Sequence, residues 1–105
     1  MKAADLQKNF TGQTQAIAYA AADQMTANYL RDCLLMMFSG MYGEISEEDT
    51  AANNAELEAG EGRILARYKA YGKLTDDIYI IAYFSESNPD DIDYNYTMIE
   101  YRSEY

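Results

Sequence analysis

Hydrophobic and polar residues alternate along two neighbouring segments in the second half of the chain, residues 62–71 and 77–84. Successive side chains of a strand point to opposite faces, so this alternation predicts two β-strands. One face of each strand would be apolar, formed by Ile64, Ala66, Tyr68 and Ala70 in the first and by Ile78, Ile80, Ala82 and Phe84 in the second. The glycine-containing stretch between them predicts a turn. We therefore expect an antiparallel hairpin that the rest of the chain covers or extends.

Residues 14–38 contain neither Pro nor Gly and are rich in good helix formers, which predicts one long helix. Gly40 or Gly43 would end it in the left-handed conformation. The preceding Phe10-Thr11-Gly12 would be a break between a short initial turn and this helix. The expected buried stripe consists of Ala18, Ala21, Met25, Tyr29, Cys33, Met36 and Met37.

A second helix is expected at residues 47–59. Ser46 and the carboxylates that follow it are typical of a helix start, and Gly60 is typical of a helix end. After the turn signal Asn88-Pro89-Asp90, residues 94–102 predict a third strand whose two faces are both half apolar.

These elements indicate a single α+β domain over residues 1–105, with two N-terminal helices followed by a three-stranded antiparallel β-meander. The long helix would pack across one face of the sheet and leave the other face exposed and able to bind another protein. An alternative is a homodimer in which residues 34–41 and the second sheet face pair between copies.

The charge is concentrated in the second part of the chain. The net charge is −10, and residues 1–43 carry three carboxylates against three basic side chains. The remaining residues carry 15 carboxylates against 5 basic side chains, which accounts for the whole excess. Such a protein repels phosphate backbones, so we expect no direct binding of nucleic acid and consider a basic partner. The alternative is a surface that only keeps the protein in solution.

Several kinds of chemistry have no support in the composition. The chain has no His and a single cysteine, Cys33, which excludes the usual serine and cysteine triads and a zinc site. It has no phosphate-binding glycine loop, so no cofactor is expected. Asp90, Asp91 and Asp93 could hold a hard cation, but they lack the spacing of an EF-hand, and no metal site is expected. No segment approaches the roughly 20 apolar residues of a membrane span, and no secretory signal is visible, so we expect a soluble, cytoplasmic protein.

Acidic residues and tyrosines are interleaved near the end of the chain. Tyr provides a large amphipathic contact surface, and clustered carboxylates favour a basic partner. The partner-binding residues expected from this pattern are Asp76, Asp77, Tyr79, Tyr83, Asp90, Asp91, Asp93, Tyr94 and Tyr96. In the alternative interpretation, half of these tyrosines belong to the core.

Four short segments resemble small acidic accessory proteins from mobile elements of Gram-positive bacteria, a group that includes type II anti-CRISPR inhibitors of Cas9. They are GEISEED at 43–49, GEGRILARY at 60–68, DIYII at 77–81 and the closing Glu104-Tyr105. The resemblance implies an inhibitor, active in the cytoplasm of a bacterial host cell, that binds the basic groove in which a Cas9-type nuclease holds guide RNA or DNA. It assigns no catalytic residue. Two alternatives remain: a small carboxylate-dependent nuclease acting on guide RNA, and an oligomerising accessory protein with no role in defence.

Overall fold

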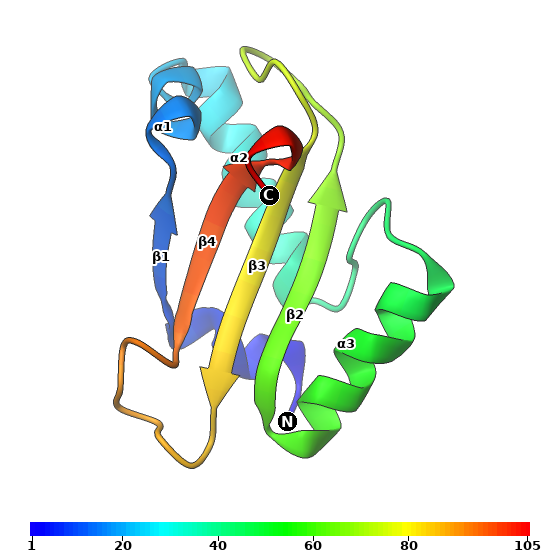
Figure 1. The fold of residues 1–105 in the computed structure, drawn as a ribbon. Coiled ribbons are helices and arrows are strands. Elements are labelled where there is room, and N and C mark those ends of the chain that lie inside the picture. Colours follow the sequence, from blue (N-terminus) through cyan, green and yellow to red (C-terminus); the bar gives the residue numbers. More distant parts are fainter.

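The computed structural model describes residues 1–105 as a mixed four-stranded sheet with helices (Figure 1). The α-helices are α1 (Gln15–Ala21), α2 (Gln24–Phe38) and α3 (Glu47–Ala59). The strands are β1 (Phe10–Gln13), β2 (Glu61–Tyr68), β3 (Ile78–Ser85) and β4 (Tyr96–Tyr101). Two short 3₁₀ helices, η1 (Ala3–Lys8) and η2 (Arg102–Glu104), lie near the two ends of the chain.

The expected α+β class and the antiparallel meander are confirmed, since β2 pairs with β3 and β3 with β4. The strand order is β1-β4-β3-β2, so the meander is extended by a strand that the sequence did not predict. This strand, β1, runs parallel to β4 from the pair Phe10↔Tyr96 to the pair Gln13↔Ile99. It is only four residues long and contains Gly12, so it has little strand propensity of its own and depends on β4 for its conformation.

The prediction of one unbroken helix over residues 14–38 is wrong, because α1 ends at Ala21 and α2 begins at Gln24. The Asp23 side chain accepts hydrogen bonds from the backbone N–H and the hydroxyl of Thr26, and thus caps a new helix. These bonds hold the pKa of Asp23 below its usual value. The break also changes the buried stripe: Met25 is 54% exposed, whereas Thr26 and Leu30 are buried.

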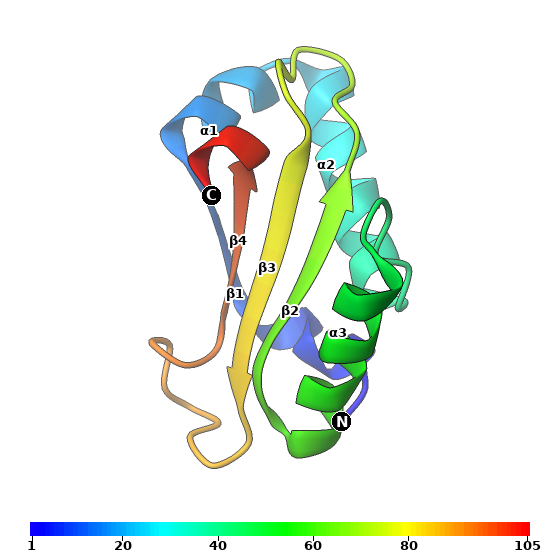
Figure 2. The same cartoon turned by 45° about the vertical axis from the view of Figure 1, so that its right-hand side comes forward.

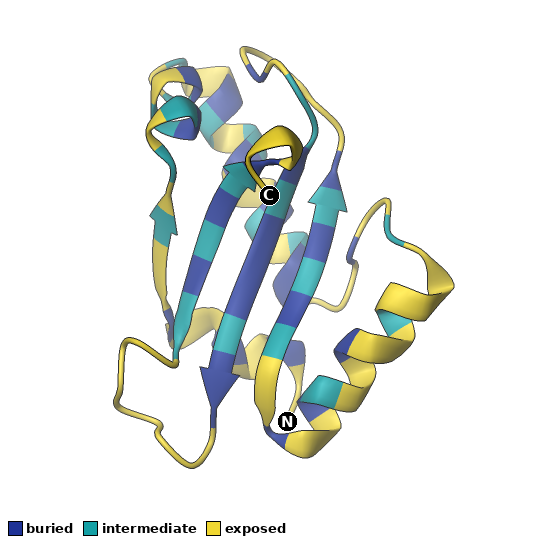
Figure 3. Cartoon of the chain, viewed as in Figure 1, coloured by how far each residue is buried: buried dark blue, intermediate teal, exposed yellow.

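One face of the sheet is covered by α1, α2 and η1, which all lie on the same side (Figures 1 and 2). Buried and half-buried positions alternate along β2 and β4, and β3 between them is mostly buried, as Figure 3 shows. The core between the layers includes Ile17, Cys33 and Met37 from the helices and Ile64, Ile78 and Ile80 from the strands. Burial raises the pKa of the Cys33 thiol to about 11, so this side chain stays protonated at neutral pH.

The outer edge of β2 is covered by α3 and by the segment before it. Ser46 caps α3 by accepting from the Asp49 N–H, and Gly60 ends it with a φ of 78°, both as expected. Asn53 of α3 pairs with the backbone of Leu65, through Nδ2 to the carbonyl at 2.8 Å and from the N–H to Oδ1 at 2.9 Å. We call the outer edge of β2 the covered edge of the sheet. No helix of the protein has the length and apolar character that crossing a membrane requires.

Candidate partner-binding surface

The sheet face opposite α1 and α2 carries large side chains, and of the helices only the short η2 lies over one end of it (Figure 2). We call it the open face. It combines aromatic, apolar and charged residues from three strands, namely Arg63, Leu65, Arg67, Tyr79, Ile81, Tyr83, Tyr96, Met98 and Glu100. Most of these residues are half-buried, because neighbouring side chains cover one another across the strands.

Two tyrosine pairs lie on the open face. Tyr83 and Tyr96 are directly opposite on β3 and β4, and their rings stack with centroids 4.7 Å apart. Tyr79 meets the ring of Tyr105 edge-on at 4.9 Å. Burial raises the pKa of Tyr96, and the neighbouring Tyr83 adds to this effect. Three of the predicted tyrosines, Tyr79, Tyr83 and Tyr96, therefore share one surface.

The C-terminal residues fold back over one end of the open face (Figure 1). The Arg63 guanidinium donates to the Tyr105 hydroxyl and lies 5.5 Å from its ring centroid. This hydrogen bond raises the pKa of Arg63, so the group remains a cation. Glu104 accepts from the Tyr101 N–H at 2.7 Å and from the Thr14 hydroxyl at 3.0 Å, which fixes η2 in place.

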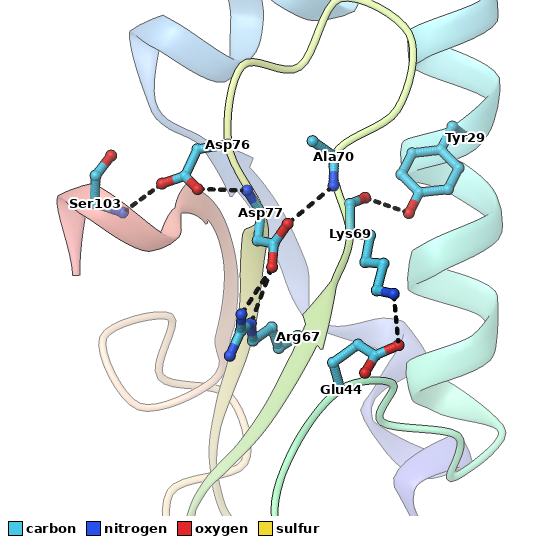
Figure 4. A network of polar contacts seen from close by, with 8 residues as sticks. All are labelled: Tyr29, Glu44, Arg67, Lys69, Ala70, Asp76, Asp77 and Ser103. Atoms are coloured by element: carbon cyan, nitrogen blue, oxygen red, sulfur yellow. Dashed lines mark hydrogen bonds and ion pairs between the residues drawn. The ribbon is translucent and has the colours of Figure 1, made fainter.

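Asp76 and Asp77 lie at this same end and are engaged within the protein (Figure 4). Asp77 Oδ2 accepts from Arg67 Nη2 at 2.8 Å and Nε at 3.2 Å, and Oδ1 accepts from the Ala70 N–H at 3.2 Å. The hydrogen bonds from Arg67 are the main reason that the pKa of Asp77 falls below its usual value. Asp76 accepts from the N–H groups of Asp77 and Ser103. These two carboxylates hold the β2–β3 turn and η2 together. Because the chain turns here, β2 ends at Tyr68 instead of continuing to residue 71.

The other predicted carboxylates, Asp90, Asp91 and Asp93, lie in the β3–β4 loop at the opposite end of the sheet and are exposed, as is Tyr94. The β3 strand of eight residues separates them from Asp77 by roughly 25 Å. Asn95 fixes the loop by donating to the carbonyls of Asn88 and Asp91. The nine predicted residues thus form two acidic groups, with Tyr79, Tyr83 and Tyr96 on the open face between them and Tyr94 in the loop.

A shallow groove of about 320 Å³ opens where the loop meets the start of β2 and the end of α3. Its lining brings three carboxylates together with two tyrosines: Glu56, Glu61, Asp93, Tyr83 and Tyr94. We call these five residues the acidic foot. Two of its carboxylates, Glu56 and Glu61, come from outside the predicted set. Strand alternation could have predicted that Arg63 and Tyr83 are neighbours on one face of the hairpin. The approach of α3 to the loop, which brings Glu56 into the groove, depends instead on tertiary packing.

The carboxylates of the acidic foot have no cationic neighbour within ion-pair distance. The chain contains two ion pairs, Arg67–Asp77 at 2.8 Å and Lys69–Glu44 at 3.9 Å, and both lie elsewhere. No Lys or Arg occurs between Arg31 and Arg63, so α3 carries no basic side chain of its own, and Arg63 of β2 lines a hollow with Asp49 and Glu56 without forming an ion pair. This end of the molecule therefore has a negative potential that a cationic surface would complement.

No group of three or more His, Cys, Asp or Glu side chains is arranged to hold a metal ion. Comparisons with protein-family models, curated proteins and solved structures gave no match to this chain.

Proposed function

We propose that the protein is an inhibitory binding protein that docks its acidic foot and the adjoining tyrosines on the basic nucleic-acid groove of a nuclease, of which a Cas9-type enzyme is the first candidate. The observation that carries this proposal is the acidic foot itself, where unpaired carboxylates stand beside exposed and half-exposed tyrosine rings. Cas9-type enzymes hold their guide–target duplex in a positively charged channel. An acidic protein seated there would compete with guide RNA or with DNA.

The distribution of charge supports a groove rather than a flat apolar surface as the target. Carboxylates of α3, β2 and the β3–β4 loop converge at one end of the molecule, and the sheet face beside them is aromatic. Tyrosine rings can stack on arginine side chains and contribute contact area at low entropic cost. The combination presents negative charge and flat rings together, as a nucleic acid does.

The first experiment is an order-of-addition assay with purified Cas9. The protein is added before or after guide RNA, and DNA cleavage and guide length are measured on the same gel. Competition for the groove predicts inhibition with intact guide, stronger when the protein is added first. A shortened guide would contradict the proposal and indicate a nuclease. Unchanged cleavage in both orders would remove Cas9 as the target and favour an accessory protein without a role in defence.

A further inference from the structure

The two edges of the sheet differ in how far other parts of the chain cover them. At the covered edge, the Asn53 side chain forms hydrogen bonds with the outward N–H and C=O of Leu65. The outward N–H of Arg67 donates to the Tyr42 carbonyl at 3.0 Å, and the Arg67 carbonyl accepts from the Glu44 N–H at 2.7 Å. The opposite edge is β1, which we call the free edge, and no helix or loop lies along it in either view of the fold (Figures 1 and 2). Unpaired strand edges are templates for pairing with another chain.

The backbone groups of the free edge follow from the hydrogen bonding of β1 to β4. The Thr14 N–H donates to the Ile99 carbonyl at 3.1 Å. Because alternate residues of a strand point their backbone groups to the same side, Gly12 also faces β4. Thr11 and Gln13 therefore direct both N–H and C=O outward, and their side chains make no hydrogen bond within the protein. The free edge thus offers two donors and two acceptors in regular alternation.

The free edge also lacks the charges that commonly prevent such pairing. Residues 9–22 contain no Lys, Arg, Asp or Glu, although the protein as a whole carries a net charge of −10. Natural edge strands are usually protected by Lys, Pro, a bulge or very short length, and of these β1 has only its length of four residues. Here an uncharged strand leads into an uncharged helix, so no like charges lie directly opposite one another along the paired strands. The nearest carboxylates lie at the two ends of the strand, Asp90 and Asp91 beside Phe10 and Glu104 beside Thr14.

We propose that the free edge pairs with the free edge of a second copy, antiparallel about a two-fold axis at Gly12. In this register Thr11 of one copy lies opposite Gln13 of the other, and the outward donors of each strand meet the acceptors of its partner. Phe10, which is 63% exposed in the single chain, packs where the two β1 strands meet. The two four-stranded sheets become one sheet of eight strands, and the two open faces become continuous.

The position of Gly12 allows a direct test by cross-linking. A β-carbon at Gly12 would lie 3.5 Å from the nearest atoms of Met98 and Phe10, an ordinary contact, so Gly12→Cys is compatible with the fold. Under mild oxidation this variant should form a disulfide-linked dimer on a non-reducing gel. The matched control is Glu61→Cys at the start of the β2 strand, which should remain monomeric. The native Cys33 is fully buried and should not contribute.

Sedimentation of the unmodified chain tests the same proposal without a new cysteine. The dimer fraction should rise with protein concentration, and also with salt, because salt screens the repulsion between two acidic copies. Thr11→Glu combined with Gln13→Glu places carboxylates opposite one another and should raise the dimer dissociation constant by at least roughly tenfold. The control, Gln7→Glu with Asn54→Glu, makes the same charge change at exposed positions outside the strands and should raise it far less.

Three outcomes would overturn the proposal. They are a monomeric wild type at all concentrations and salt levels, equal cross-linking of Gly12→Cys and Glu61→Cys, and a dimer that the double-Glu variant leaves intact. The last outcome would point instead to residues 34–41. None of these outcomes bears on nuclease binding, since a monomer with an intact acidic foot can still inhibit.

Discussion

At the scale of single residues, the Asn53 side chain forms hydrogen bonds at the outer edge of β2 that a neighbouring strand would otherwise form. It is 3% exposed and holds both backbone groups of Leu65. Asn53→Ala would leave a buried donor and acceptor unpaired, which outweighs the better helix propensity of Ala. We expect the free energy of unfolding to fall by about 2–3 kcal/mol in urea denaturation. Asn54→Ala, the exposed neighbour on the same helix, should cost less than about 0.5 kcal/mol, and equal losses would contradict this role.

Asp77 gives the protein a pH-dependent contribution to stability. Its pKa is lowered in the folded state, chiefly by Arg67, relative to an unfolded value of about 3.9. A depressed pKa stabilises the fold at pH values above the unfolded pKa, and this contribution is lost as the pH falls through the folded pKa. Asp77→Asn should therefore reduce stability by about 1 kcal/mol at pH 7, and the difference from wild type should shrink below about pH 4.

Chemical denaturation at pH 7 and at low pH would measure this difference. Asp32→Asn makes the same charge change at an exposed carboxylate without a hydrogen-bond partner. It should alter stability by less than about 0.5 kcal/mol at pH 7. A pH-independent difference for Asp77→Asn would show that the Arg67 contact contributes nothing as an ion pair.

At the scale of elements, Gly43 allows the segment before α3 to approach β2. Its φ is 74°, and a β-carbon there would lie 2.0 Å from the Arg67 carbonyl oxygen. Gly40 has a similar φ of 83°, but nothing lies within 4 Å of its would-be β-carbon. Gly40→Ala should thus report backbone strain alone, about 1–2 kcal/mol. Gly43→Ala should cost at least about 2 kcal/mol more, because a backbone clash adds to the strain.

Amide exchange would locate that clash. The Arg67 N–H, bonded to the Tyr42 carbonyl at 3.0 Å, should exchange faster in Gly43→Ala than in Gly40→Ala. Equal stability of the two variants, with equal protection at Arg67, would mean that this segment does not depend on a glycine.

The elements that were predictable are those whose pattern is local. The hairpin, α3 with its caps at Ser46 and Gly60, and the glycine stop after α2 all follow from periodicity and capping. The break at Asp23 was missed because Ala-rich sequence on both sides favours helix, and a capping Asp is a weaker signal than Pro or Gly. Strand β1 was missed because its conformation depends on β4, some 85 residues later in the chain.

At the scale of the whole molecule, the candidate site was predictable only in part. Strand alternation could place Tyr79 and Tyr83 on one face, but the separation of Asp76 and Asp77 from the loop carboxylates depends on β3 running between them. The contributions of Glu56 and Glu61 to the acidic foot required the packing of α3 beside the loop. Sequence clustering of acids and tyrosines therefore overstated how closely they assemble.

The two proposed associations should respond to salt in opposite directions. Binding to a basic groove is driven by attraction between opposite charges, so its affinity should fall between about 50 and 200 mM salt. Self-association at the free edge brings together two copies of like charge and should strengthen over the same range. Fluorescence anisotropy for the nuclease and sedimentation for the dimer would measure the two trends. A salt-insensitive affinity for the nuclease would indicate an apolar interface instead.

Charge reversal at the acidic end tests whether this end of the molecule binds the nuclease. Asp90→Lys with Asp93→Lys changes two exposed carboxylates in the β3–β4 loop whose side chains make no hydrogen bond. Asp32→Lys with Glu48→Lys makes the same charge change on α2 and at the start of α3, away from the acidic foot. Calorimetric titration into guide-free Cas9 should show at least roughly tenfold weaker binding for the loop variant than for the helix variant. Equal affinities for two folded variants would contradict the claim that this end of the molecule binds the nuclease.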